Sequence, residues 1–367
     1  MGLEERWLSL VSGDTRGFGA TAQRAALQAL AGLYWLGLRG NLALYELGLR
    51  QHTHASLPVI SVGNLTVGGT GKSTTVRFLA RQLTAMGLKP GVVLRGHRRQ
   101  GGAEELLASD GRGTLAPLGE CGDEALEVAR ALPDVPVAVG KRRERVIELL
   151  AGQGAQIALL DDGYQYFRMA RNLNLALVSA RLDLRTARLL PRGVLREPWS
   201  HLRRADQVWL THCDLAQPEQ LATITQLVKR HVPAVPLVLT RHQPQVLVSL
   251  REGTLRPLSD LQGRTVLALS GLGCPESFEG SLTALGARVV PLRFPDHHPY
   301  EPADWERVEQ AMRTAGEALV VTTEKDAVKL PPGEPLPVCV LRSELEILEN
   351  AEAVADALGS MKTIAHG

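Results

Sequence analysis

The sequence predicts an α/β protein with a mostly parallel sheet, helices on both faces, and a smaller C-terminal α/β lobe joined through a hinge. Three observations predict this fold class. Apolar runs without period-two alternation are separated by helical segments, which is typical of parallel strands buried on both faces. A glycine-rich turn lies between the first such run and a helix, at residues 65–71. A proline-containing stretch, residues 232–257, separates the first set of runs from a second.

Composition sets the limits of the interpretation. The 367 residues are 44% hydrophobic, enough for two domains with a real core. A net charge of +2 gives no argument for nucleic acid as a partner, and no obligate protein partner is evident. The first residues carry no apolar region followed by a cleavage site, so we expect no secretory signal. The cysteines lack paired or metal-ligand spacing and are expected to be buried thiols: Cys121, Cys213, Cys274 and Cys339.

The N-terminal segment, residues 19–50, has helical spacing and is rich in Ala and Leu. Its uninterrupted apolar part is shorter than the about 20 residues that cross a bilayer. Tyr34, Trp35 and the flanking Arg24 and Arg39 suit the lipid headgroup level. We weigh two interpretations evenly, a helix lying in a membrane interface and an amphipathic helix docked on the protein's own core.

The next segment is typical of a phosphate-binding loop. An apolar strand at 59–62 runs into the glycine-rich turn, and a helix compatible with residues 73–86 follows. Glycines allow backbone N–H groups to surround an anion at the positive end of the helix, while Lys72 reaches the β- and γ-phosphates and Ser73 binds Mg²⁺. Thr66 stands where the usual pattern has glycine; the alternative is a tight turn without a ligand. The expected nucleotide-binding residues are Thr66, Val67, Gly68, Gly69, Thr70, Gly71, Lys72, Ser73 and Thr74.

Strands and helices alternate after this loop, which predicts a P-loop NTPase-like core. The expected strands are 59–62, 90–94, 135–139, 157–160, 173–178 and 207–211, with helices such as 124–131 and 141–151 as cover. A second α/β unit has expected strands at 265–269, 287–292, 318–322 and 338–341 and helices near 275–285 and 302–315. The expected segments are 1–50 (interfacial helix), 51–235 (core), 236–262 (hinge or connecting strands) and 263–367 (C-terminal lobe), with closure around a ligand.

Two adjacent carboxylates, Asp161 and Asp162, end an apolar strand. Ligands of open parallel sheets bind at this edge, and an acidic residue there is the expected partner of Mg²⁺ or its water shell. A turn cap would explain only one of the two carboxylates. A metal-binding or catalytic role is therefore favoured for Asp161 and Asp162.

Asp123 opens a helix, so it is either an N-cap or a residue that accepts a proton from an attacking hydroxyl. His297 and His298 lie on a proline-bounded loop without further Cys or His at zinc-ligand spacing. A histidine oriented by Asp296 and brought to Asp123 would act as a base or orienting group. Sequence does not decide which histidine this is.

Arginines follow two strands or turns near the presumed ligand edge, at 142–145 and 192–196, and their planar forks suit phosphate. A solvated basic face is the alternative. The segment 323–326, Thr-Glu-Lys-Asp, ends another strand but does not fit the Asn-Lys-x-Asp pattern of guanine-reading proteins. Guanine specificity is therefore unsupported.

Taken together, the segments 63–72, 122–124, 160–165, 195–197, 296–298 and 323–326 resemble the tetraacyldisaccharide 4'-kinase family, the lipid A 4'-kinases of Gram-negative bacteria, over nearly the whole chain. The resemblance implies an ATP- and Mg²⁺-dependent transfer of the γ-phosphate to the 4'-hydroxyl of tetraacyldisaccharide 1-phosphate, by a peripheral or monotopic protein at the cytoplasmic face of the inner membrane. It also implies roles for particular residues: Asp123, His297 and Lys72 in catalysis, Ser73, Asp161 and Asp162 at the metal, and Arg143, Gln165, Arg196 and Glu197 at the substrate or phosphate.

Two positions depart from the family pattern. Ser73-Thr74 replaces the common Thr-Pro but keeps the metal-binding hydroxyl, whereas Tyr166 replaces a common histidine and offers no imidazole. The alternative function is a membrane-associated binding protein or GTPase that is switched by its nucleotide. Such a switch has no need of the Asp123 and histidine pair.

Overall fold

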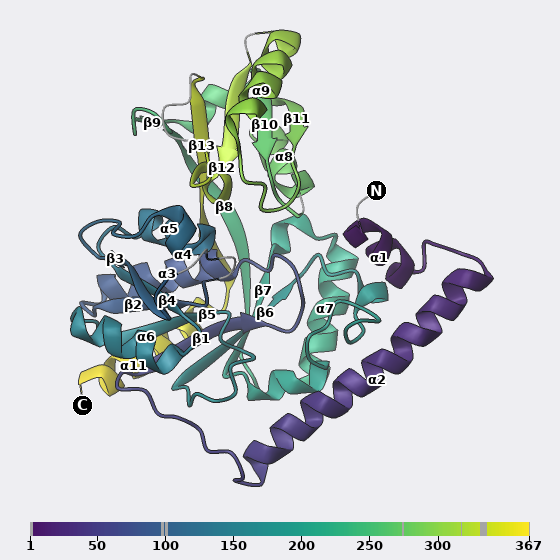
Figure 1. Cartoon of the computed structure of the whole chain (residues 1–367), viewed down its shortest axis with the longest axis vertical. Coiled ribbons are helices and arrows are strands. Elements are labelled where there is room, and N and C mark those ends of the chain that lie inside the picture. Colours follow the sequence, from purple (N-terminus) through teal and green to yellow (C-terminus); the bar gives the residue numbers. More distant parts are fainter. Residues whose placement is uncertain are drawn as a thin grey trace. The chain divides into compact units, whose positions relative to one another are not determined.

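The computed structural model describes residues 3–96, 99, 102–273, 275–316, 318–330 and 336–366. They form two compact units, each assembled from separate stretches of chain. The first unit comprises the described residues of Met1–Arg95, Arg142–Arg241 and Ile347–Gly367, and the second comprises those of Gly96–Lys141 and His242–Glu346. Figure 1 labels the elements along the chain.

The first unit is built on a parallel sheet. Its strands are β1 (Val59–Asn64), β2 (Pro90–Leu94), β5 (Ile157–Asp161), β6 (Leu173–Ser179) and β7 (Gln207–Thr211). Their order is β7-β6-β1-β5-β2, and Ile60 of β1 lies beside Leu159 on one side and Leu173 on the other. Every residue of β1 and β5 is buried. The absence of period-two alternation in the sequence thus has the expected cause, a sheet buried on both faces.

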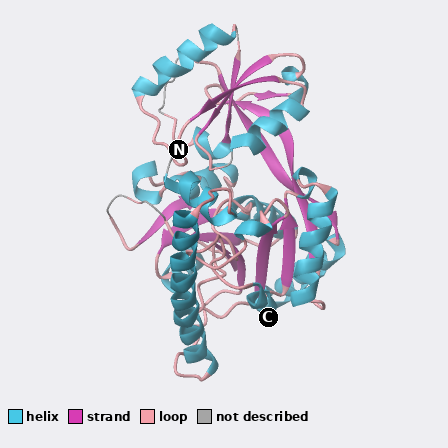
Figure 2. Ribbon diagram, turned by 90° about the vertical axis from the view of Figure 1, so that its right-hand side faces the viewer, coloured by secondary structure: helices cyan, strands magenta, loops and turns pink. Residues whose placement is uncertain are grey.

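The helices of this unit are α1 (Leu3–Ser12), α2 (Phe18–Glu46), α3 (Lys72–Ala85), α6 (Arg143–Gly152), α7 (Pro218–His231) and α11 (Ala351–His366). Helix α3 packs on β1, β2 and β5, and α6 packs on β2. Helix α7 carries Pro218 at its first position and three basic residues in its last turn, a distribution that suits the helix dipole. Figure 2 shows α2 as one long uninterrupted helix.

The second unit contains a parallel sheet with the order β11-β10-β12-β13. Its elements are β10 (Thr265–Ser270), α8 (Pro275–Ala284), β11 (Arg288–Arg293), α9 (Pro302–Ala315), β12 (Leu319–Thr323), α10 (Glu324–Ala327) and β13 (Val338–Glu349). Alternate residues of β10 belong to different cores: Val266 packs with Phe278 of α8, and Leu267 packs with Trp305 of α9. Helices therefore cover both faces of this sheet.

A second part of this unit comes from the middle of the chain. It contains β3 (Glu105–Asp110), α4 (Leu118–Cys121), α5 (Asp123–Ala131) and β4 (Pro136–Gly140), with β3 and β4 paired antiparallel. Strand β8 (Leu237–Ser249) begins in the first unit, where its first residues pair with β7 in parallel, and ends in the second, where it pairs with β9 (Leu255–Arg256) in antiparallel orientation. Short 3-10 helices are Leu184–Thr186, Trp199–Arg204, Cys213–Leu215 and Leu258–Leu261. The mostly parallel α/β fold class is confirmed.

The compact units divide the chain differently from the segments 51–235 and 263–367. Residues 96–141, which contain β3, β4, α4 and α5, are grouped with the second unit. The end of the chain returns to the first unit, where Lys362 of α11 donates a hydrogen bond to the Met86 carbonyl at 2.8 Å. Cys121, Cys213 and Cys339 are buried free thiols, and Cys274 lies outside the described residues.

Candidate active site

The loop between β1 and α3 has the backbone of an anion site. Gly68 and Gly71 have φ values of 96° and 78°, a region that residues with a side chain avoid. Among the described residues, the N–H groups of Gly68, Gly69, Thr70 and Gly71 donate no hydrogen bond to another protein group. These residues directly precede α3, which begins at Lys72, and the dipole at this end of the helix favours negative charge. The predicted phosphate loop is therefore supported by its backbone.

The first residues of the predicted loop are engaged elsewhere. The Val67 N–H donates to the Val194 carbonyl at 2.8 Å, and Thr66 pairs with Leu195. The Val67 N–H is thus already bound to another backbone group, and the assignment of Thr66 and Val67 to the nucleotide stays a prediction. The free donors begin at Gly68.

Two side chains that the sequence interpretation did not single out shape the loop. Asn64 donates from Nδ2 to Thr70 Oγ1 at 2.8 Å, and Thr211 at the end of β7 donates to the Thr70 carbonyl at 3.1 Å. Both side chains are fully buried. Asn64 stands inside a recognised motif, but its contact with Thr70 spans a loop whose shape is not evident from sequence.

Ser73 and Asp161 form the oxygen pair expected for a metal that accompanies a nucleotide. The Ser73 hydroxyl donates to Asp161 Oδ2 at 3.0 Å. The parallel register of β1 and β5 places Asp161 beside Val62, next to the loop. Among the described residues no group of three or more His, Cys, Asp or Glu side chains is arranged to hold a metal ion.

Asp162 has different partners from Asp161. Its φ is 55°, so its backbone lies in the left-handed region and its side chain leaves the direction of the strand. Arg196 grips its carboxylate with two hydrogen bonds, 2.8 Å and 3.1 Å long, and Lys72 Nζ lies 3.6 Å from Oδ1. The two neighbouring carboxylates therefore hold different groups, a hydroxyl and a pair of cations. Arg196 Nη2 also contacts Asn64 Oδ1.

The other residues assigned to the substrate lie deeper. Gln165 donates to the Asn64 carbonyl at 2.8 Å and to Glu197 at 2.9 Å, and Glu197 has no exposed surface. His201 contacts the same carboxylate at 2.8 Å, and Arg204 contacts it as well. Burial raises the pKa of Glu197, but these partners outweigh burial and lower it below its usual value. Glu197 thus holds Gln165, which binds the backbone of Asn64 at the start of the loop, and it is not exposed to contact a substrate.

Arg143, the first residue of α6, is 3% exposed and lies with its guanidinium 5.6 Å from the centre of the Tyr166 ring. Burial lowers the pKa of Arg143, and the charges of Tyr166, Asp162 and Asp161 act in the opposite direction. Tyr166 donates its hydroxyl to Glu144 at 2.8 Å. Tyr166, which stands where the family commonly has a histidine, therefore packs on Arg143 and offers no imidazole.

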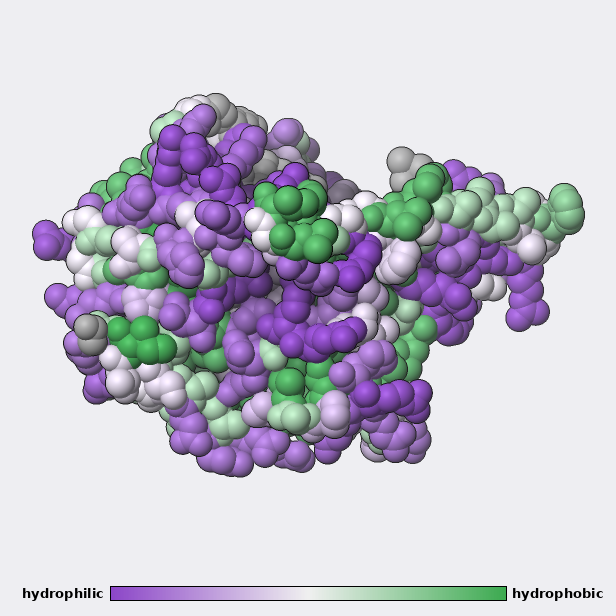
Figure 3. All heavy atoms as spheres, turned by 90° about the horizontal axis from the view of Figure 1, so that it is seen from below, coloured by the Kyte–Doolittle hydropathy of each residue, from purple (hydrophilic) through white to green (hydrophobic). Residues whose placement is uncertain are grey.

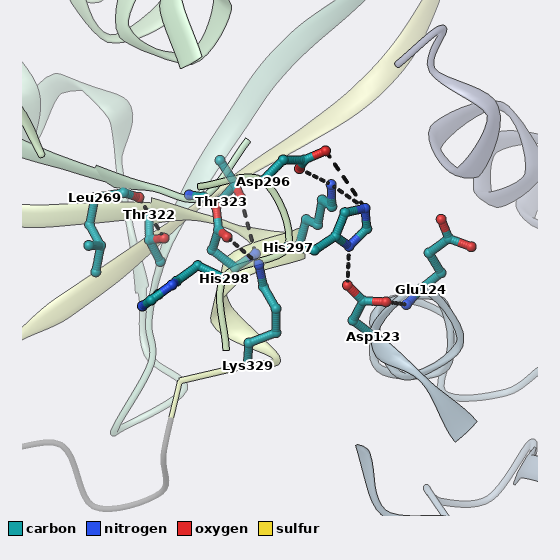
Figure 4. A network of polar contacts seen from close by, with 12 residues as sticks. Asp123, Glu124, Leu269, Asp296, His297, His298, Thr322, Thr323 and Lys329 are labelled. Carbon is teal, nitrogen blue, oxygen red and sulfur yellow. Dashed lines mark hydrogen bonds and ion pairs between the residues drawn. The ribbon is translucent and has the colours of Figure 1, made fainter. Parts of the chain in front are cut away.

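The second unit contains the carboxylate and histidine pair. Asp123 is the first residue of α5, whose N-cap is Gly122, so the N-cap interpretation of Asp123 is wrong. His297 Nδ1 lies 2.6 Å from Asp123 Oδ2, and Figure 4 shows the ring directed at this carboxylate. His298 turns to Asp304 at 2.7 Å instead. The pairing that the sequence left open is thus with His297.

Two opposing effects determine the pKa of Asp123. Burial raises its pKa, but the hydrogen bond and charge of His297 outweigh burial and lower the pKa from 3.8 to about 2. Asp123 Oδ1 accepts the N–H of Glu124 at 3.0 Å. The carboxylate is therefore ionised at neutral pH and retains lone pairs for a proton from an acceptor.

Comparison with known proteins decides the family. The family described as Tetraacyldisaccharide-1-P 4'-kinase matches residues 23–361. The chain belongs to this family. It is 41% identical to Tetraacyldisaccharide 4'-kinase from Anaeromyxobacter dehalogenans (strain 2CP-C) over 332 residues, which cover 88% of this chain and 85% of the relative. Identity to the enzyme of the same name from Syntrophus aciditrophicus (strain SB) is 37%, with 88% of each chain covered.

A solved structure agrees with the 4'-kinase family. The crystal structure of "apo" form LpxK from Aquifex aeolicus in complex with ATP matches with a TM-score of 0.73 and 29% identity. The match covers 92% of this chain and 99% of that chain. The family resemblance predicted from the sequence is thereby confirmed, and the alternative of a nucleotide-switched binding protein or GTPase is not favoured.

Proposed function

We propose that this member of the 4'-kinase family transfers the γ-phosphate of ATP to the 4'-hydroxyl of tetraacyldisaccharide 1-phosphate, with Mg²⁺ as cofactor, in lipid A biosynthesis. The observation that carries the proposal is the Ser73 hydroxyl 3.0 Å from Asp161 Oδ2, directly after a row of backbone donors that bind no other described group and next to Lys72. This combination is what nucleotide-dependent phosphoryl transfer requires from a protein. The identity of the phosphate acceptor is inferred from the names of the 4'-kinase relatives.

The donor atoms suit Mg²⁺. This ion prefers oxygen ligands and usually keeps only one or two from the protein, with phosphate oxygens and water completing its shell. Ser73 Oγ and an Asp161 carboxylate oxygen are such ligands, and Asp161 is only 5% exposed. When bound, the ion neutralises charge on the phosphates. We assign Ser73 and Asp161 as its protein contacts and Asp162 as the group that orients Lys72 and Arg196.

The chain's own residues provide alignment and charge compensation. Backbone N–H groups from Gly68 to Gly71 hold the phosphates, and Lys72 neutralises their charge. Arg196 is held by both oxygens of Asp162, so its remaining donors are oriented toward the loop side at Asn64. Transfer through a loose transition state requires the nucleophile and phosphate to be in line and little covalent help.

Asp123 is the proposed proton acceptor for the hydroxyl. Proton transfer to a positioned side chain typically accelerates a reaction by about 10² to 10⁴-fold. His297, 2.6 Å away, orients this carboxylate. Because a pKa of about 2 keeps Asp123 ionised throughout the neutral range, it is ready to receive the proton as the new bond to phosphorus forms.

The exposed apolar side chains of α2 support the proposal that the protein binds a membrane surface. Among its described side chains only Ala20 and Ala31 are buried, whereas Leu33 is 65% exposed and Leu36 is 58% exposed. A helix that is apolar on several sides is normally covered. Figure 3 shows hydrophobic surface at the right of the view, on the side where Figure 1 places α1 and α2. No helix within the described residues has the length and apolar character needed to cross a membrane.

We therefore propose that α2 lies in the interface of the inner membrane, at its cytoplasmic face, where the lipid acceptor resides. Within the first unit, α2 contacts the segment that carries Arg196, because the Tyr34 hydroxyl donates to the Arg196 carbonyl at 2.7 Å. This contact connects the membrane-facing helix with the arginine that lies beside Asn64 and Asp162. A lipid held at α2 is thereby kept near Arg196 of the same unit.

The test is acceptor-dependent consumption of ATP. Purified protein in detergent micelles is incubated with ATP and Mg²⁺, with and without tetraacyldisaccharide 1-phosphate, and ADP is measured. We expect ADP formation only with the acceptor and a matching amount of bisphosphorylated lipid by mass spectrometry. If folded protein that binds ATP forms ADP at the same rate with and without the lipid, the proposal is contradicted and a nucleotide-switched binding protein is favoured.

A further inference from the structure

The Thr-Glu-Lys-Asp segment at 323–326 has no role in the transfer described so far. In the structure Thr323 caps α10 by accepting the Asp326 N–H at 3.2 Å, and the buried Asp326 accepts the Gly271 N–H at 3.1 Å. These bonds fix the start of α10 firmly. They leave Lys325 directed to the loop that carries His297.

Lys325 makes two contacts there. Its Nζ lies 2.9 Å from Asp296 Oδ1 and 3.3 Å from His297 Nε2. An ammonium group has donors only, so the ring nitrogen that faces it must accept. The ring proton then belongs on Nδ1, where it is donated to Asp123 Oδ2 at 2.6 Å. Figure 4 shows His297 between Asp123 and Asp296, with contacts on both ring nitrogens.

The charges around the ring oppose each other. Asp123 on α5 and Asp296 Oδ2, 3.8 Å from Nε2, favour a protonated ring, and Glu124 follows Asp123 on the same helix. Lys325 acts against protonation of the ring, whereas Lys329 acts on Asp123, whose pKa it lowers, and is paired with Asp326 at 2.7 Å. Within the described residues, Lys325 is the cation that contacts the ring.

We propose that Lys325 is a positioning residue that holds His297 neutral with its proton on Nδ1, so that Asp123, and not His297, receives the proton of the acceptor. The inference rests on the proposed kinase function. Because Nε2 is engaged by Lys325, His297 has no lone pair to offer a hydroxyl. The charge of His297 is one of the causes that lower the pKa of Asp123, so a neutral ring lowers that pKa less than an imidazolium does and leaves Asp123 a better base.

Loss of the Lys325 ammonium group is expected to shift the pH profile in a defined direction. Without Lys325, the cation that contacts Nε2 is gone, whereas the carboxylates of Asp123 and Asp296 remain beside the ring and favour its protonated form. The acid limb of kcat/KM is then expected to move to higher pH by about one unit, since the site is partly exposed. The rate below the limb falls about tenfold, and the rate well above it recovers.

The experiment compares Lys325→Met with Lys325→Arg, and with Lys229→Met on the exposed side of α7 as a control for the chemical change. The pH profile of kcat/KM is measured for each protein. We expect the acid limb to shift only in Lys325→Met, with Lys325→Arg close to the wild type. Equal losses at every pH, or a Lys325→Met profile parallel to that of the wild type, would overturn the inference.

A second readout is independent of turnover. Histidine ¹⁵N shifts of the wild-type protein at neutral pH, assigned through a His297→Gln variant, report the protonation of each ring nitrogen. We expect a neutral ring with the proton on Nδ1; a proton on Nε2 would overturn the inference even where Lys325→Met fails to fold. A wild-type protein without acceptor-dependent turnover contradicts the proposed function instead, so the two failures are distinguishable.

Discussion

Replacement of Asp123 by Asn removes the proposed proton acceptor while keeping its shape. The amide oxygen still accepts from His297 Nδ1, so the contact at 2.6 Å and the start of α5 are retained. General base catalysis contributes about 10² to 10⁴-fold, and a carboxylate is less effective the further its pKa lies below the working pH. Because the pKa of Asp123 is about 2, we expect the lower end of this range, a fall in kcat on the order of 10². This corresponds to about 2.7 kcal/mol.

The assay is initial-rate kinetics with saturating acceptor, together with calorimetry for Mg-ATP. We expect kcat to fall and nucleotide affinity to stay unchanged, because the phosphate loop does not include Asp123. A rate within threefold of the wild type would refute the reasoning, with threefold taken as roughly the margin of context dependence. A loss of nucleotide affinity equal to the loss of rate would point to a structural role.

The Asp123 pKa also predicts a pH dependence of stability. A carboxylate with a pKa lowered from 3.8 to about 2 stabilises the folded state above pH 3.8, and this contribution is lost as the pH falls toward 2. The difference in stability between wild type and Asp123→Asn should therefore shrink as the pH falls through this window. Chemical denaturation at several pH values measures it, and a difference that grows on acidification would contradict the assigned shift.

Three further perturbations test other parts of the account. Ser73→Ala should raise the Mg²⁺ concentration required for half-maximal rate by about tenfold, with Ser73→Thr as a rescuing control, because a hydroxyl ligand is lost. Glutamate at Leu33 and Leu36 should release the protein from vesicles of anionic lipid in a flotation assay, whereas Gln28→Glu on the same helix should not. Gly63→Ala should lower stability by about 1 to 3 kcal/mol in thermal unfolding, because an added Cβ meets the Tyr164 backbone nitrogen at 2.7 Å. Unchanged metal dependence, vesicle binding or unfolding temperature would contradict the respective assignment.

Most of the sheet was predictable because its strands are buried on both faces and leave continuous apolar runs. Strand β10 shows why: Val266 and Leu267 enter different cores, so neighbouring positions are both apolar. Strand β3 (Glu105–Asp110) was missed because only Ala108 and Ser109 of its six residues are buried. Its antiparallel partner β4 was predicted, but the grouping of both strands with the second unit depends on contacts between distant parts of the chain.

The candidate site was predictable in residue type and less so in the task of each residue. The glycine turn, Ser73 and the Asp161-Asp162 pair follow from a pattern with a known mechanism. The separate partners of the two carboxylates depend on the left-handed backbone of Asp162, which a sequence does not reveal for Asp. The buried position of Glu197 likewise depends on His201 and Arg204, contacts made only after a 3-10 turn forms. Lys325 lies in segment 323–326, which the sequence placed in the family resemblance without a role, because its contact with His297 joins segments that are distant in the chain.

The most direct test of the central claim is the position of the transferred phosphate. Lipid recovered after incubation of the purified protein with Mg²⁺, tetraacyldisaccharide 1-phosphate and ATP labelled in its γ-phosphate is analysed by phosphorus NMR with proton correlation. The account predicts a new phosphomonoester that carries the label and is attached at the 4'-carbon of the acceptor. Label that appears only in inorganic phosphate, or on another hydroxyl of the lipid, would contradict it.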